Sequence, residues 1–88
     1  MRNKVIVYGL VKNNTNNKVL VGTIEDIRTF IKNRWKDVDT YITQITGIKV
    51  EEDFYAYVDD TKNLFTTMNK MGYEATNLCE VPIEDFMN

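Results

Sequence analysis

The stretch that decides the fold runs from residue 4 to residue 30, KVIVYGLVKNNTNNKVLVGTIEDIRTF. Its first nine residues are rich in β-branched side chains, which favours a strand covered on one face and partly on the other. NNTNN (13–17) supplies residues that tolerate left-handed backbone and hydrogen-bond in turns. KVLVG (18–22) reads as a second strand, so the sequence predicts a β-hairpin over 4–22 with a five-residue loop. The asparagines are thus a turn rather than a functional cluster.

A helix is predicted directly after the hairpin. Thr23 can cap it by accepting a hydrogen bond from the amide of Asp26, and acidic residues suit the positive end of the helix dipole. Apolar side chains at helical spacing form one face: Ile24, Ile27, Phe30, Ile31 and Trp35. Basic side chains form a stripe beside it: Arg28, Lys32, Arg34 and Lys36.

Residues 37–47, DVDTYITQITG, carry two competing signals. Apolar residues recur at helical spacing, Asp37 can cap and Gly47 can end a helix. The many β-branched residues favour a strand instead. We expect a second short helix here, with the strand as the alternative.

The C-terminal half is predicted to alternate strand, helix and strand. GIKVEEDFYAYV (47–58) ends in a dense apolar run typical of a central strand. The next helix begins near Thr61 and ends at Gly72. YEATNLCEV (73–81) alternates as a last strand, and the tail 83–88 is expected to form a helical turn.

These elements predict an α+β fold in a single domain, 1–88. Its small antiparallel sheet contains the N-terminal hairpin plus one or two later strands. Two or three helices pack on one face of that sheet.

Composition excludes most enzyme classes. The chain has one Cys and neither His nor Ser, so it lacks the usual nucleophile–base pairs and the usual ligands of zinc, copper and haem. We therefore expect no catalytic residue, no metal and no cofactor. Cys79 is predicted to be a small buried residue. A single thiol, and apolar stretches too short for a membrane span, predict a soluble cytoplasmic protein with no membrane partner.

Charge is distributed unequally along the chain. Residues 1–36 carry eight basic and two acidic side chains, whereas residues 37–88 carry three basic and eleven acidic ones. Such asymmetry indicates a partner surface, unless the two halves neutralise each other in the fold.

The two helices predicted over 23–46 look like a helix-turn-helix element behind a sheet. Such an element would place polar residues of its second helix against bases and the basic stripe against phosphates. Asp37 and Asp39 argue against this, because their charge would be repelled by DNA. The base-facing candidates are Thr40, Thr43, Gln44 and Thr46, and the phosphate-contacting candidates are Arg28, Lys32, Arg34 and Lys36.

VEEDFYAYVDD (50–60) surrounds three aromatic residues with five carboxylates. On a strand, contiguous carboxylates would point to opposite faces, which disfavours a Mg²⁺ site. Clustered charges and tyrosines are typical of protein-binding surfaces, and could imitate the charge of nucleic acid. The candidate partner-binding residues are Glu51, Glu52, Asp53, Tyr55 and Tyr57.

The order strand, turn, strand, GTIEDI-type helix start and Thr- and Tyr-rich second helix resembles that of short accessory proteins of phages and mobile elements. The resemblance covers about half the chain. It implies a non-catalytic binding protein that inhibits or modulates a host protein or protein–nucleic acid complex, as anti-CRISPR inhibitors do. The alternative is a small DNA-binding transcriptional regulator; direct nucleic-acid binding and a homodimer both stay open.

Overall fold

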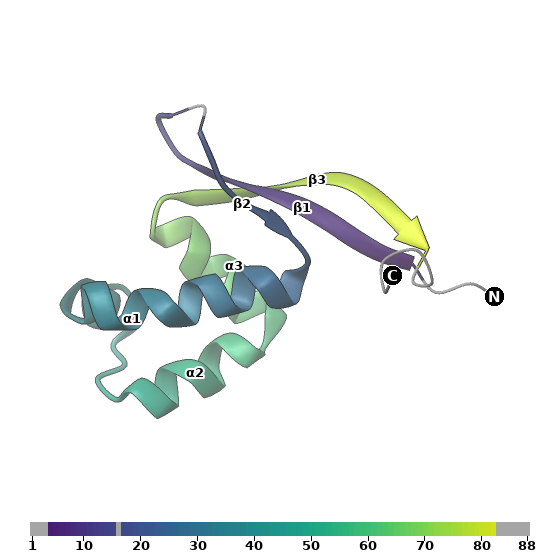
Figure 1. Ribbon diagram of the computed structural model, residues 1–88. Coiled ribbons are helices and arrows are strands. Elements are labelled where there is room, and N and C mark those ends of the chain that lie inside the picture. Colours follow the sequence, from purple (N-terminus) through teal and green to yellow (C-terminus); the bar gives the residue numbers. More distant parts are fainter. Residues whose placement is uncertain (1–3, 16, 83–88) are drawn as a thin grey trace.

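The computed structural model describes residues 4–15 and 17–82, and its sheet and helices confirm the predicted α+β class (Figure 1). The three strands are antiparallel and stand in the order β2-β1-β3. The predicted tail 83–88 lies outside the described residues. The elements along the chain are β1 (Lys4–Lys12), β2 (Lys18–Gly22), α1 (Ile24–Thr46), α2 (Glu51–Asp59), α3 (Thr61–Lys70) and β3 (Tyr73–Pro82).

The predicted hairpin is confirmed. β1 and β2 pair with Leu10 opposite Leu20, and the turn between them contains Asn14 at a φ of 67°. Asn adopts this left-handed conformation more readily than most residues do. The Thr15 hydroxyl donates a hydrogen bond to the Lys12 carbonyl at 2.9 Å. The asparagine-rich segment therefore serves the turn, as its composition indicated.

The strand at the centre of the sheet is β1, with β3 along its whole length. β3 pairs from Lys4 opposite Pro82 to Lys12 opposite Tyr73. β2 reaches only residues 8–11 of β1. β1 is thus a central strand near the hairpin turn but lacks β2 beside it over its first four residues.

α1 is one continuous helix of 23 residues, so the prediction of two helices with a turn between them is wrong. Thr23 and Asp26 form a capping box at its start, as predicted for Thr23, and Gly47 ends it at a φ of 77°. Its buried apolar residues, Ile27, Ile31, Trp35 and Ile42, line a single face of the helix. Because this apolar stripe continues from Trp35 to Ile42 with neither Gly nor Pro between them, the helix does not break.

α2 replaces the central strand predicted over 47–58, which is the second correction. Phe54 and Val58, four residues apart, are both fully buried, and the Phe54 ring stacks on Trp35 at 5.3 Å between centroids. Three carboxylates occupy the first turn of α2, where the helix dipole favours negative charge. Aromatic and β-branched residues favour strands only weakly, and here packing against α1 and α3 decides.

The helices all lie on one side of the sheet, as predicted, in two layers (Figure 1). α1 and α3 contact the sheet, whereas α2 contacts only α1 and α3. Leu10 and Tyr73 supply the sheet's share of the buried core, and Leu64 and Met68 supply that of α3. α2 is consequently the layer farthest from the sheet.

Candidate binding surfaces

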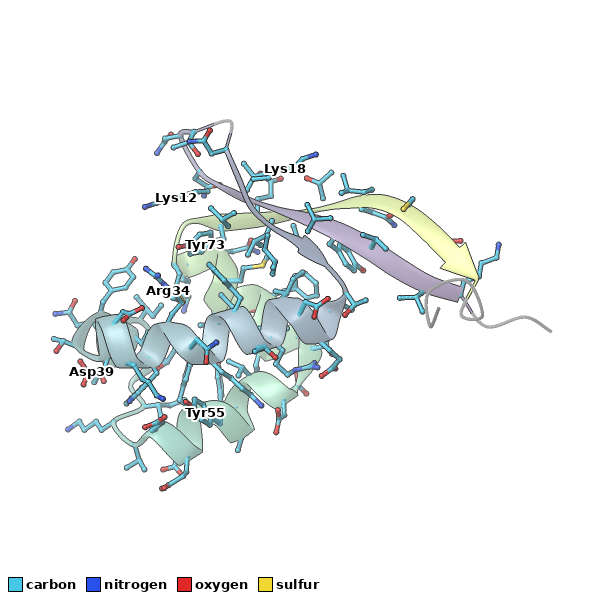
Figure 2. The ribbon with its side chains drawn as sticks, viewed as in Figure 1. Lys12, Lys18, Arg34, Asp39, Tyr55 and Tyr73 are labelled. Carbon is cyan, nitrogen blue, oxygen red and sulfur yellow. The ribbon has the colours of Figure 1, made fainter. Side chains whose placement is uncertain are left out.

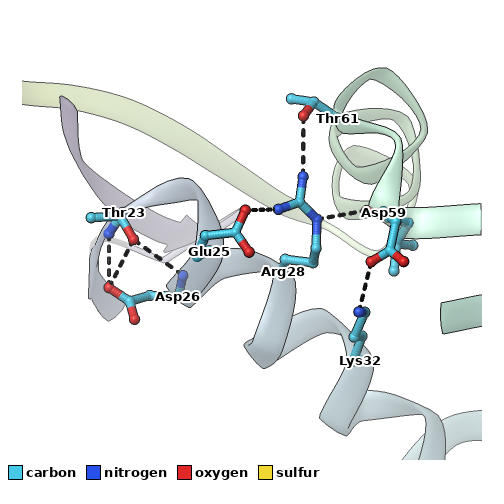
Figure 3. Close-up of polar contacts among 8 residues, drawn as sticks. Thr23, Glu25, Asp26, Arg28, Lys32, Asp59 and Thr61 are labelled. Atoms are coloured by element: carbon cyan, nitrogen blue, oxygen red, sulfur yellow. Dashed lines mark hydrogen bonds and ion pairs between the residues drawn. The ribbon is translucent and has the colours of Figure 1, made fainter. Parts of the chain in front are cut away.

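Arg28 does not belong to a solvent-facing basic stripe, contrary to its predicted contact with phosphate. Its side chain is only 10 % exposed, and its Nε donates to the Val58 carbonyl at 2.9 Å (Figure 3). Its guanidinium also donates to Thr61 Oγ1 at 3.1 Å and to the Glu25 carboxylate. The Val58 carbonyl belongs to the last turn of α2, where carbonyls have no partner within the helix. Arg28 of α1 therefore caps α2 from outside and joins it to the start of α3.

The other members of the stripe are also drawn into the fold to different degrees. Lys32 donates to Asp59 at 2.7 Å and lies 5.6 Å from the centre of the Tyr55 ring. Arg34 lies 3.7 Å from Asp37, with its side chain 34 % exposed. Lys36 is exposed. The structure thus does not bring the four cations together as one free surface.

The predicted base-reading residues lie in the C-terminal part of α1 without a recognition-helix geometry. Thr40 and Gln44 are exposed, whereas the hydroxyl of Thr43 donates to the Ile48 carbonyl at 2.9 Å. The hydroxyl of Thr46 likewise donates to the Ile42 carbonyl, at 2.8 Å. Two of the four hydroxyl or amide groups thus stabilise the end of α1, and the helix-turn-helix element expected over 23–46 is absent from this continuous helix.

The predicted acidic surface gathers on α2. We use this name for Glu51, Glu52, Asp53, Tyr55 and Tyr57. Glu52 and Asp53 are exposed, and within the described ranges no ion pair reaches either of them. Glu51 and the two tyrosines are half-buried. Glu51 to Asp53 follow one another in the first turn of a helix, not on a strand, so they do not alternate between two faces.

Two groups of α2 have altered acidity. The Tyr55 hydroxyl donates a hydrogen bond to Glu51, and this bond, with a smaller effect of burial, raises the pKa of Tyr55 above 10.0. The Lys32 ammonium hydrogen-bonds to Asp59 and holds the pKa of that carboxyl below its ordinary value of 3.8. Both changes follow from local contacts that stabilise the helix layer.

Some of the charge asymmetry is neutralised within the fold. Lys4 lies 3.8 Å from Glu80, and Lys32 lies beside Asp59, so each pair joins the basic to the acidic half of the chain. The negative surplus left at the solvent is clearest on α2, which contains four carboxylates and no basic residue.

A feature that the sequence interpretation missed is the outer sheet face, the side of the sheet away from the helices. Successive strand residues point to opposite sides, and Leu10 points into the core. Val5, Val7, Gly9 and Val11 of β1 therefore point outward. Residues of the neighbouring strands that pair with them share this side: Val21, opposite Gly9, and Cys79, opposite Val7.

Exposure confirms that this face is open. Val21 is 57 % exposed and Leu78 is 41 % exposed. A Cβ on Gly9 would meet the Leu78 side chain at 3.3 Å, so Leu78 covers the hollow above Gly9. Cys79 is exposed, which corrects the prediction of a buried thiol. The sequence VIVYGLV (5–11) already indicated an apolar outer face, because a strand with one solvent-facing side usually alternates apolar with polar residues.

The described residues show few of the features that a small-molecule site or a catalytic site requires. A hollow of about 320 Å³ lies at the start of β1 and α1, lined by Lys4, Val5, Ile6, Thr23, Ile24 and Glu25. Its polar groups are the Lys4 ammonium, the Thr23 hydroxyl, which caps α1, and the Glu25 carboxylate, which accepts a hydrogen bond from Arg28. No group of acidic, cysteine or histidine side chains in the described part of the chain could hold a metal ion. None of the described helices combines the length and the apolar character that a membrane span requires.

Comparison with protein families, with curated proteins and with solved structures gave no match to this chain.

Proposed function

We propose that the chain is a non-catalytic binding protein that docks through the acidic surface of α2 on a basic surface of a larger host protein. The observation that carries this proposal is the position of α2. It contacts only other helices, and it exposes Glu52 and Asp53 without an ion pair among the described residues. Charges of this kind can serve a partner because, beyond their favourable position in the first turn of α2, no ion pair among the described residues occupies them.

The partner's chemistry follows from the surface. Two exposed carboxylates stand beside half-buried tyrosine rings, so a complementary surface would offer Arg or Lys side chains. A groove that binds nucleic acid has this character, and covering it would inhibit its owner. This supports the hypothesis of an accessory protein of a phage or mobile element that blocks a host enzyme.

DNA binding by the basic stripe is the weaker candidate. Arg28 is buried and Lys32 is paired with Asp59, so both would have to give up internal contacts to reach phosphate. The continuous α1 also lacks the turn that lets a recognition helix enter a groove.

The test is capture of host proteins on the full chain, from nuclease-treated bacterial lysate, followed by affinity measurement with the purified partner. Glu52→Lys combined with Asp53→Lys should weaken binding at least tenfold, and the affinity of the unchanged protein should fall with salt. Glu51 is left intact because it accepts the hydrogen bond of Tyr55.

A control is Asp39→Lys combined with Asn69→Lys, which adds positive charge at exposed positions of α1 and α3 that make no ion pair among the described residues. Circular dichroism should show both double variants folded. The proposal is refuted if the α2 variant binds the partner as tightly as the control does.

A further inference from the structure

The outer sheet face is mostly apolar, with Thr76 opposite Gly9 as a polar residue near its middle, and nothing within the described residues covers it. Its middle contains valines, Gly9 under Leu78, and Cys79. An exposed apolar patch of a few hundred Å² is often functional. The question is which occupant fits.

The charged residues at one end of the outer sheet face indicate which occupant fits. Lys18 of β2 and Glu74 of β3 both pair with Val11 of β1, so they lie at the same level along the strands, on either side of β1. Both are exposed, and Figure 2 shows Lys18 on the side of the sheet away from the helices. Neighbouring strands lie about 4.8 Å apart, so roughly 10 Å separates the two backbones.

We infer that the occupant is a second copy of this chain, packed face to face about a two-fold axis close to the direction of β1. Such an axis places β2 of one copy over β3 of the other at the same level along the strands. Lys18 then faces Glu74 of the partner subunit, and Glu74 faces the partner subunit's Lys18. Two apolar sheets pack about 10 Å apart, a gap that these two side chains can bridge.

Other arrangements fit less well. An in-plane axis perpendicular to the strands would carry Lys18 to the opposite end of the sheet, away from Glu74. Pairing two copies through the outer edge of β3 meets a bulge between its partners Val7 and Tyr8, and Pro82 at the strand's end. Bulges and prolines hinder edge-to-edge association. The face therefore suits self-association better than the edge does.

The dimer is expected to be weak. Two strands of about 30 Å and a third of about half that length make a face of roughly 350 Å², which is well below the roughly 800 Å² per partner of a standard interface. We expect a dissociation constant in the micromolar range. The α2 layers would then point away from each other, so a dimer would present two acidic surfaces.

Sedimentation velocity of the full chain between about 5 and 500 µM is the first test. A concentration-dependent dimer is expected. Lys18→Glu and Glu74→Lys should each weaken it at least tenfold, because each places like charges in contact. The two changes combined should restore it, whereas the control Lys62→Glu, exposed on α3, should leave it unchanged.

Cys79 provides a second measurement on the unaltered protein. It is the only cysteine in the sequence and lies on the outer sheet face. Because β2 does not reach the level of Val7, the proposed axis leaves Cys79 uncovered, so its rate of reaction with a disulfide reagent should change little between dilute and concentrated protein; a severalfold slowing would contradict this axis.

A monomer at every concentration would overturn the inference, as would a dimer in which the charge swap fails to restore affinity. Neither result touches the function proposed for α2, because that proposal is tested by binding of the host partner and by variants on another layer.

Discussion

Replacing Arg28 by Met should destabilise the protein strongly, although a solvent-facing position on α1 would tolerate the change. Met keeps most of the apolar stem but removes every hydrogen bond of the guanidinium. The Val58 carbonyl at the end of α2 and the Thr61 hydroxyl at the start of α3 both lose their donor. The junction between the two helices then lacks its connection to α1.

The magnitude follows from these contacts. Hydrogen bonds from a charged donor contribute about 1.5–3 kcal/mol each, and a buried carbonyl left without a partner costs about 1–3 kcal/mol. Relief of the buried charge offsets part of this loss. We expect a net decrease of about 2–4 kcal/mol in the free energy of unfolding. For a domain of this size, that lowers the melting temperature by roughly 10–25 °C.

The assay is urea denaturation followed by circular dichroism and by fluorescence of Trp35, which is buried in the core. Lys36→Met is the matched control, since Lys36 is exposed on the same helix and should change stability by less than about 0.5 kcal/mol. Arg28→Lys keeps the charge but not the planar fork of donors, so it should recover only part of the loss. Equal stability of the Arg28→Met and Lys36→Met variants would refute the assignment of Arg28 as a structural residue.

Two further changes test other contacts. Because Lys32 lowers the pKa of Asp59, that carboxylate contributes stability above its unfolded pKa, near 3.8, and the contribution is lost as the pH falls through the lower folded pKa. Asp59→Asn should therefore be less stable than the unaltered protein at pH 7 and equal to it well below pH 3.8; a gap that persists in denaturation at acid pH would contradict this. Gly22→Ala should destabilise the protein by about 2 kcal/mol, since the new Cβ would lie 2.8 Å from the Cβ of Asp26 and disturb the capping box. Thermal melting checks it, and a melting temperature within 2 °C or so of the unaltered protein would show that the first turn of α1 shifts at no cost.

The sequence by itself determined the elements whose signals are local. NNTNN turns the chain between two β-branched strands, and Thr23 caps the next helix through Asp26, all within a few residues. The alternation of apolar and polar residues over 73–81 likewise predicted the last strand, β3. These features were predictable because turn, cap and alternation preferences act between near neighbours.

Only the tertiary structure decided the rest. The run around Phe54 is compatible with a strand or a helix, and its burial against Trp35 selects the helix. In an isolated helix Arg28 could be a solvent-facing cation. In the folded protein its side chain caps the end of α2 by donating to the carbonyl of Val58, thirty residues later. The open outer sheet face follows from the placement of the three described helices, α1, α2 and α3, on one side of the sheet. Such outcomes depend on which distant segments meet, and that information is not contained in a local pattern.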